Sequence, residues 1–279
     1  MNNSRDWQSL AYLLGLPALV AWSWMQASFD VKAYVGILVL VIGVCCISHN
    51  HAHVPIWRAS WLNRLTDMWI GILQGQPVFL FQPAHVASHH RFNQGAEDLT
   101  RVARYSAENT LIGYLVFPFQ VLPALQELRK KHLASLWREK RDEFWWVVAL
   151  HVPLLTLWIT VFWLDPIKAT IYVLIPQLVG LHFLLASNYL QHAHAVAGSR
   201  YNHSRNFVGL INVIWFNVGY HTAHHENEKL HWTLLPEAHR DIASRINPAL
   251  VEFSLLVYTF RTLLLGLILP HLRSIQLKD

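Results

Sequence analysis

Charged residues are scarce in this chain. Asp, Glu, Lys and Arg together make up 14% of its 279 residues, whereas hydrophobic residues make up 53%. Soluble domains carry about 25% charged residues, and the mean hydropathy here is positive, at +0.26. The composition therefore excludes an ordinary soluble domain and indicates an integral membrane protein.

Cysteine is nearly absent. The two cysteines, Cys45 and Cys46, are adjacent and lie within an apolar run. Zinc and iron–sulfur sites need thiolates that are spaced apart along the chain, so this pair excludes a cysteine-based metal site of either kind. We interpret both residues as small side chains in the lipid phase. The sequence also lacks internal repeats and low-complexity segments.

Four apolar stretches are long enough to cross a bilayer, which takes about 20 helical residues. They cover roughly residues 9–27, 31–47, 144–164 and 167–187. Short connections predict that the first two stretches form one antiparallel hairpin and the last two another. Shorter apolar stretches, predicted to be interfacial or re-entrant helices, cover residues 68–81, 110–125 and 206–219. For residues 250–271 we predict an interfacial helix, with a fifth span as the alternative, because the stretch includes Glu252 and Arg261.

Lysine and arginine are distributed unevenly between the connections. Residues 50–143 carry eleven of them, whereas the two hairpin turns carry one each, Lys32 and Lys168. Because cytoplasmic connections are enriched in basic residues, residues 50–143 and 188–279 are predicted to be cytoplasmic. This orientation explains the net charge of +5 better than nucleic-acid binding does, since the basic residues lie beside apolar stretches. The first apolar run is expected to be a span and not a cleaved signal peptide, because no clear cleavage site follows it.

Histidine is unusually abundant, with eighteen residues that gather where the predicted spans end. His49 and His53 end the second span; at about 100° per residue they share one helix face, whereas His51 points away. At the end of the fourth span, Asn188 and His192 also share a face. Two further groups have the spacings H-x3-HH and H-x2-HH, and they are His85, His89 and His90, and His221, His224 and His225. All four groups are predicted to converge on one site at the cytoplasmic side.

Imidazoles gathered in this way favour a metal site. A single histidine at a membrane interface is more often a hydrogen-bonded or interfacial side chain than a ligand, but several groups at ligand spacing on one side reverse that preference. Neutral imidazole binds both iron and zinc well. Iron adds a redox cycle that activates oxygen, which zinc does not supply.

The histidine groups resemble the three histidine boxes of the membrane fatty acid desaturase and hydroxylase superfamily. The resemblance extends to neighbouring residues, which are His89-His90-Arg91-Phe92, Glu97-Asp98, Asn188 with Tyr189-Leu190-Gln191-His192, and Trp232, Leu235, Pro236 and His239. It covers about residues 31–240. The second box has three intervening residues where many members have two, and His51 is an additional histidine, so no subfamily is assigned.

The resemblance implies an all-α integral membrane fold, in which four transmembrane helices carry a cytoplasmic helical cap with a histidine-rich di-metal site. It also implies two non-haem irons held by nine histidines, which are His49, His53, His85, His89, His90, His192, His221, His224 and His225. Asn188 would reach the metal through water. We interpret four other histidines as lying outside the ligand set, either supporting the ligands or on the surface: His51, His194, His203 and His231.

By the same resemblance, we expect oxygen-dependent oxidation of an unactivated C–H bond in a fatty acid or fatty acyl chain, with desaturation as the first interpretation. Hydroxylation of a fatty acid or alkane and oxidative decarboxylation to a terminal alkene stay open, because the boxes are common to these reactions. Electrons would come from a ferredoxin, rubredoxin or similar protein with its reductase, since the chain has no cysteines for an iron–sulfur centre. Basic residues between Arg129 and Arg141 could dock such a carrier, although topology and anionic lipid also explain them.

Two other classes of protein also place histidines near membrane helices. A metal transporter would carry its ligands at mid-span along a pathway, whereas these histidines gather at one predicted surface. A zinc membrane hydrolase needs a carboxylate base beside its histidines, as in HExxH. No histidine box contains a carboxylate, and the nearest one is Glu226, directly after His225.

Overall fold

The computed structural model of the protein describes residues 1–80 and 82–278. Phe81, the last residue of the predicted 68–81 stretch, and Asp279 lie outside the described residues. Helices dominate: within the described residues the strands are β1 (Asn206–Phe207) and β2 (Val251–Glu252), of two residues each. The predicted all-α class is therefore confirmed.

The chain divides into two compact units. The first unit comprises Met1–Gln82 and Arg129–Leu184, and the second comprises Pro83–Leu128 and Leu185–Asp279. Two long helices, α6 (Leu111–Glu139) and α10 (Ile175–His192), each contribute residues to both units. His49 and His53 therefore belong to the first unit. The other proposed ligands belong to the second unit, and they are His85, His89, His90, His192, His221, His224 and His225.

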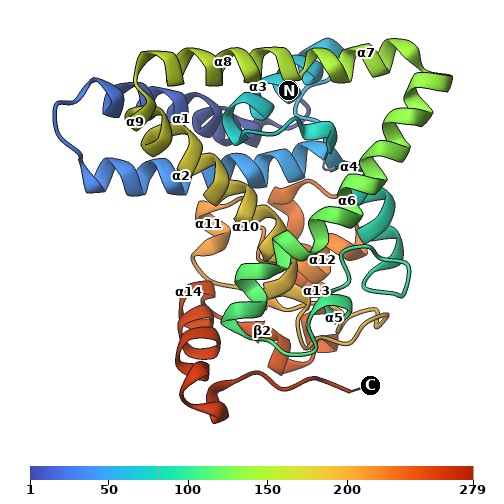
Figure 1. The fold of residues 1–279 in the computed structure, drawn as a ribbon. Coiled ribbons are helices and arrows are strands. Elements are labelled where there is room, and N and C mark those ends of the chain that lie inside the picture. The colour runs from blue at the N-terminus through green and yellow to red at the C-terminus, as the bar shows by residue number, and fades with distance from the viewer. Residues whose placement is uncertain (81, 279) are drawn as a thin grey trace. The chain divides into compact units, whose positions relative to one another are not determined.

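In the first unit, α1 (Trp7–Met25) and α2 (Val31–His53) lie side by side (Figure 1). Asp30 ends the turn between them, and its carboxylate accepts the backbone N–H groups of Lys32 and Ala33 at 2.8 and 3.1 Å. A helix start leaves such N–H groups without intrahelical partners, so this cap sets where α2 begins. The first predicted hairpin is confirmed.

The second hairpin begins its return helix with a similar cap. Asp165 accepts the N–H groups of Ile167 and Lys168 at 3.0 and 2.9 Å. Lys168 donates from Nζ to the carbonyl of Trp24 at 2.6 Å, so the two hairpin turns lie close together. The elements of this hairpin are α7 (Arg141–Ala149), α8 (His151–Leu164), α9 (Pro166–Ala169), the π-helical turn η4 (Thr170–Leu174) and α10.

One more helix, α3 (Ser60–Gln74), packs on α2 and α8 within the first unit. It ends at Gly75, whose φ of 78° is a left-handed conformation that glycine adopts without steric cost. The predicted stretch 68–81 therefore captured only the second half of α3, because polar residues earlier in the helix interrupt the apolar run. Two short 3-10 turns complete this unit, η1 (Ser4–Asp6) and η2 (Val78–Leu80).

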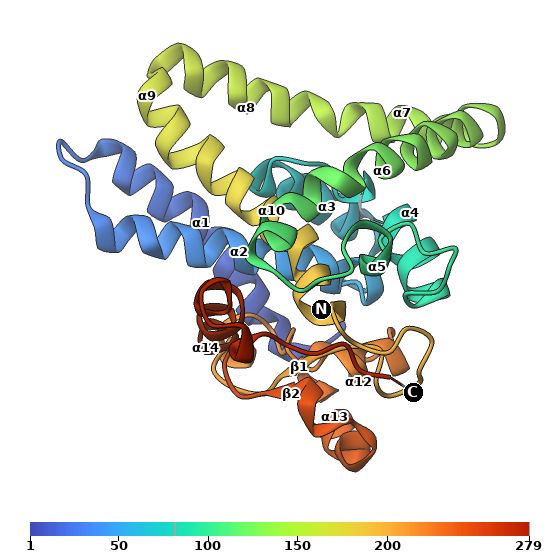
Figure 2. The same cartoon turned by 60° about the horizontal axis from the view of Figure 1, so that its bottom comes forward.

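The second unit consists mainly of short helices. Its two strands pair in parallel, with Asn206 opposite Val251 (Figure 2). Phe117 of α6 packs against the buried ring of Tyr189 of α10, at 5.6 Å between ring centroids. The other elements are α4 (Gln82–Ala84), η3 (His85–His90), α5 (Val102–Tyr105), α11 (Ile211–Ile214), α12 (His221–Glu226), η5 (Trp232–Leu234), α13 (Leu235–Ile242), η6 (Ala243–Arg245), η7 (Pro248–Leu250), α14 (Leu255–Tyr258), η8 (Thr259–Leu264), η9 (Leu265–Leu267) and η10 (Pro270–Leu272).

Within the described residues, four helices are long and apolar enough to span a membrane, namely Val31–His53, Leu111–Glu139, Arg141–Leu164 and Pro166–His192. The chain is thus an integral membrane protein, and three of the four spans match predicted ones. The prediction over 9–27 is the exception: this stretch forms α1, which is not among these four helices.

The stretch 110–125 was predicted to be an interfacial or re-entrant helix, and this prediction was wrong. Leu111–Glu139 is one continuous helix that passes through Pro118 and Pro123 and is long and apolar enough to span a membrane. A helix was also predicted over residues 206–219. Within it, Ile211–Ile214 is α-helical, whereas Asn206 and Phe207 form strand β1 and pair with β2.

In the tail, the apolar helix Leu255–Leu267 falls short of the roughly 20 residues that a span needs, which favours the interfacial interpretation. The cytoplasmic placement of 50–143 and 188–279 stays a prediction.

Gly219 sits where two backbone segments of the second unit meet, two residues before His221. Its carbonyl accepts the N–H of Phe207 at 2.9 Å, and a Cβ on it would lie 2.0 Å from the Phe207 carbonyl oxygen. We expect Gly219→Ala to lower the free energy of unfolding by about 1–3 kcal/mol, because the two segments must separate. Thermal unfolding in detergent measures this change.

Gly15→Ala is the matched control, because a Cβ there would meet only Leu40 Cδ1, at 3.9 Å, within helix α1. Alanine favours a helix interior over glycine by about 1 kcal/mol, so this variant should unfold at or above the wild-type temperature. Equal stability of Gly219→Ala and Gly15→Ala would show that the close approach at Gly219 carries no cost.

Candidate metal centre

Four histidines of the second unit form one compact group. His89, His192, His221 and His225 each offer a ring nitrogen, and these nitrogens all lie within 4.8 Å of one another. The Nε2 atom of His221 lies 3.0 Å from that of His192 and 3.1 Å from that of His225. The group joins η3, the end of α10 and α12, so segments more than a hundred residues apart along the chain supply it.

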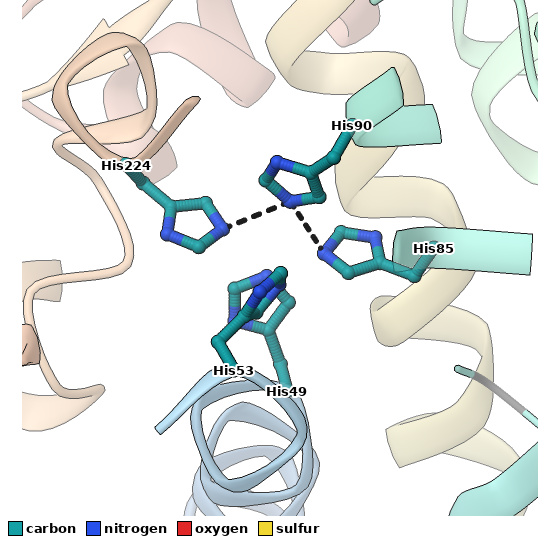
Figure 3. Close-up of side chains that lie close together, drawn as sticks. All are labelled: His49, His53, His85, His90 and His224. Atoms are coloured by element: carbon teal, nitrogen blue, oxygen red, sulfur yellow. Dashed lines mark hydrogen bonds between the residues drawn. The ribbon is translucent and has the colours of Figure 1, made fainter. Parts of the chain in front are cut away.

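The remaining histidines of η3 and α12 form a second group in the same unit. His90 Nε2 lies 3.0 Å from His85 Nε2 and 3.1 Å from His224 Nε2 (Figure 3). A π-helical turn such as η3 joins residues i and i+5, which brings His85 to His90 and turns His89 toward the other group. The second box is thus divided between the two groups by its π-helical turn, and the third box is divided along α12, where His221 and His225 lie in one group and His224 in the other.

In the first unit, His49 and His53 lie on one face of α2, with 5.0 Å between ring centroids (Figure 3). His51 engages other partners: its Nδ1 accepts the N–H of Ile56 at 3.1 Å, and its Nε2 lies 3.5 Å from Asp67. The predicted separation of His51 from the pair is confirmed.

The spacing and chemistry of both groups in the second unit suit metal ions. Two nitrogens that bind one ion at about 2.1 Å and at right angles lie about 3.0 Å apart, and the four closest Nε2 pairs are 3.0 to 3.1 Å apart. Burial, and then the proximity of His90 and His221, lowers the pKa of His225 well below its ordinary value. The ring is therefore neutral, which is the form that binds a metal.

Hydrogen bonds at Nδ1 orient the rings of His192 and His89. His192 Nδ1 donates to the carbonyl of His203 at 2.7 Å, and His89 Nδ1 donates to Asp98 Oδ2 at 2.9 Å. Since Nδ1 carries the proton in both rings, each Nε2 keeps its lone pair for a metal.

Asp98 is fully buried and is held on both oxygens. The backbone N–H of Gln94 donates to Oδ2 at 3.0 Å, and the N–H and hydroxyl of Thr100 both donate to Oδ1 at 2.8 Å. Burial by itself would raise the pKa of Asp98, but the hydrogen bonds from His89 and Thr100 bring it below its usual value. The sequence marked Asp98 only as part of a resemblance, and its contact with His89 was not foreseen.

The other residues singled out in the sequence make contacts of their own. Asn188 donates from Nδ2 to the carbonyl of Thr100 at 2.8 Å, beside the Asp98 network; its water-mediated metal contact stays a prediction. Glu226 pairs with Arg200 at 2.8 Å. The surface alternative was wrong for all four additional histidines, because tertiary contacts bury every one of them: His51, His194, His203 and His231.

Asp98→Asn is expected to weaken metal binding about 10- to 100-fold, because a carboxylate partner both orients a ligating histidine and raises its basicity. Titration of the metal-free protein with Fe²⁺ or Co²⁺ measures the affinity. Glu97→Gln is the control, since this neighbouring carboxylate is exposed. Equal affinities for both variants would contradict the assigned role of Asp98.

Comparison with known proteins agrees with this chemistry. The fatty acid desaturase family profile matches residues 31–256, a range that includes every histidine of both groups. The chain is also 21% identical over 255 residues to a sphingolipid delta(4)-desaturase of Candida albicans, an alignment that covers 86% of this chain and 67% of that protein. With most of its length matched, the chain belongs to the fatty acid desaturase family.

Proposed function

We propose that this membrane protein is a non-haem di-iron oxidase that introduces a double bond into a fatty acyl or related lipid chain in an oxygen-dependent reaction. One observation carries the proposal: seven imidazoles of the second unit gather into two groups at metal-binding separations. Family membership supports desaturase-type oxidation. The relative named as a sphingolipid desaturase supports a long-chain lipid as substrate.

The full ligand set that we propose has nine histidines. His85, His90 and His224 would hold one metal, and His89, His192, His221 and His225 the other. We also propose His49 and His53 as ligands, since they share one face of α2 and match the first histidine box. All nine ligands would be neutral imidazoles, a type of donor that suits iron.

When bound, the two irons supply the redox chemistry that activates oxygen for attack on the C–H bond. Forming the double bond removes two hydrogen atoms, that is two protons and two electrons, from adjacent carbons. A donor protein adds two more electrons and the solvent adds two more protons, so that one O2 becomes two waters. The chain itself holds the ligands in place: Asp98 and the His203 carbonyl fix two rings by their Nδ1 protons. Burial of these rings keeps bulk water from the site.

Electrons must come from another protein. The only cysteines of the chain, Cys45 and Cys46, are buried and adjacent, so we propose a ferredoxin, a rubredoxin or a similar carrier with its reductase as the donor. Exposed basic residues near the end of α6 and the start of α7 would attract an acidic carrier from the cytoplasmic side, and they are Lys130, Lys131, Arg138, Lys140 and Arg141.

The rival classes have less support. A zinc hydrolase needs a carboxylate base beside its histidines that faces the substrate. Glu226 is paired with Arg200, Asp98 is bound to His89, and Glu228 Oε2 lies 3.6 Å from Nδ1 of His90, the nitrogen opposite the one that faces the other histidines. A transporter would carry ligands along the interior of its spans, whereas η3 and α12 are short elements of the second unit. Hydroxylation and decarboxylation use the same metal site, and product analysis distinguishes them from desaturation.

Purified protein is expected to hold about two iron ions per chain and to convert fatty substrates to alkenes when it receives oxygen and electrons. Mass spectrometry of products from substrates of graded chain length, together with metal analysis, tests this. His89→Ala and His224→Ala should each abolish turnover and lower iron content, because each removes a proposed ligand. His271→Ala, at an exposed histidine, should leave both unchanged. Zinc in place of iron in the wild-type protein, together with no oxygen-dependent product, would contradict the oxidase assignment.

A further inference from the structure

Arg205 is a buried cation of the second unit, only 2% exposed, and its contacts are unusual. A buried charge is normally compensated by a carboxylate. In the described part of the chain, its guanidinium instead donates from Nη1 to the carbonyls of Leu190 and Ala193, at 3.0 and 3.1 Å. The guanidinium carbon lies 4.6 Å from the ring centroid of Tyr258. Carbonyl dipoles and an aromatic face therefore take the place of a carboxylate.

These carbonyls flank His192 at the end of α10. Helix ends leave carbonyls without intrahelical partners, and such ends fray unless other groups bind them. The backbone N–H of Arg205 adds a bond to the carbonyl of Gln191 at 2.5 Å, and the His203 carbonyl accepts the Nδ1 proton of His192 at 2.7 Å. The short segment from His203 to Arg205 thus binds the ring of His192 and also the backbone carbonyls on both sides of this histidine.

The same segment also binds α12, which carries the third histidine box. Asn206 donates from Nδ2 to the hydroxyl of Thr222 at 2.8 Å and accepts the N–H of Thr222 at 3.0 Å. The hydroxyl of Ser204 lies 2.8 Å from that of Thr222. Since Thr222 directly follows His221, these bonds fix His221 relative to the segment.

We propose that residues 203–206 form a brace that sets the separation of His192 from His221, with Arg205 as its principal positioning residue. The metal-related part of this inference rests on the proposed ligand set. Of the histidine-bearing segments, the Arg205 side chain bonds to the end of α10 around His192. Its loss should therefore weaken binding of the metal held by His89, His192, His221 and His225 and spare the other one. The other part of the inference, that residues 203–206 keep the end of α10 from fraying, does not depend on a metal and can be measured in metal-free protein.

The test compares Arg205→Met, Arg205→Lys and wild type in two measurements on the full-length protein. The first is hydrogen exchange of residues 186–194, which should become faster in Arg205→Met because the carbonyls there lose their partners. The second is titration of the metal-free protein with Co²⁺, followed by absorption spectroscopy. One of the two sites should weaken about 10- to 100-fold, as loss of supporting contacts typically does. Arg205→Lys should recover part of both effects, since an ammonium group donates to the same carbonyls.

Arg261→Met is the matched control. The guanidinium carbon of Arg261 lies 5.7 Å from the ring centroid of the same Tyr258 residue, but the side chain pairs with Glu252 and not with α10. This variant should show wild-type exchange over 186–194 and wild-type metal binding. Thr222→Val, which keeps the side-chain volume, tests the other end of the brace and should weaken metal binding even if Arg205→Met fails to fold.

The outcomes separate the brace from the proposed function. Unchanged exchange over 186–194 in a folded Arg205→Met protein overturns the brace, as does wild-type metal binding by Thr222→Val. Wild-type protein that takes up no metal, together with faster exchange in Arg205→Met, overturns the proposed function and leaves the brace standing.

Discussion

The crowding of neutral imidazoles is the constraint on which the second unit of this protein depends. Four ring nitrogens lie within 4.8 Å of one another. Protonated rings at such distances would repel strongly in a buried site, so the group persists only with neutral rings whose lone pairs share a partner. A metal ion is the partner that suits this donor set. The surrounding structure then has to hold each ring within a small fraction of an ångström.

Ring orientation comes from groups outside the histidine boxes. His89 is held by the buried carboxylate of Asp98, and His192 is held by the backbone carbonyl of His203. Neither holding group belongs to a histidine box, and each acts on the ring atom that faces away from the other histidines. Such supporting contacts set the tautomer as well as the direction of a ligand. The orientation of these two rings therefore depends on residues that the histidine boxes do not include.

In the first unit, hydrogen bonds pair polar groups that lie within apolar helices. Gln177 lies in α10 and is buried, yet it accepts a hydrogen bond from Trp158 Nε1 at 2.9 Å and donates to the carbonyl of Ile72 at 2.9 Å. Aspartates cap the helices after both hairpin turns. In a lipid environment an unpaired polar group costs several kcal/mol, so these bonds stabilise the arrangement of helices that the apolar sequence only outlines.

The sequence by itself determined the membrane class, most of the spans and which histidines gather. Composition excludes a soluble fold, and helical periodicity places His49 and His53 on one face, because both features depend on residues close together in the chain. Tertiary structure alone decided how the boxes divide into two groups, since that division follows from the π-helical turn at His85–His90 and from segments far apart in sequence. It also decided that Asp98 supports His89 and that Arg205 holds α10, because no local pattern encodes a contact between distant segments. At Pro118, which is buried, packing overrides the local helix-breaking preference of proline, and the helix continues through it.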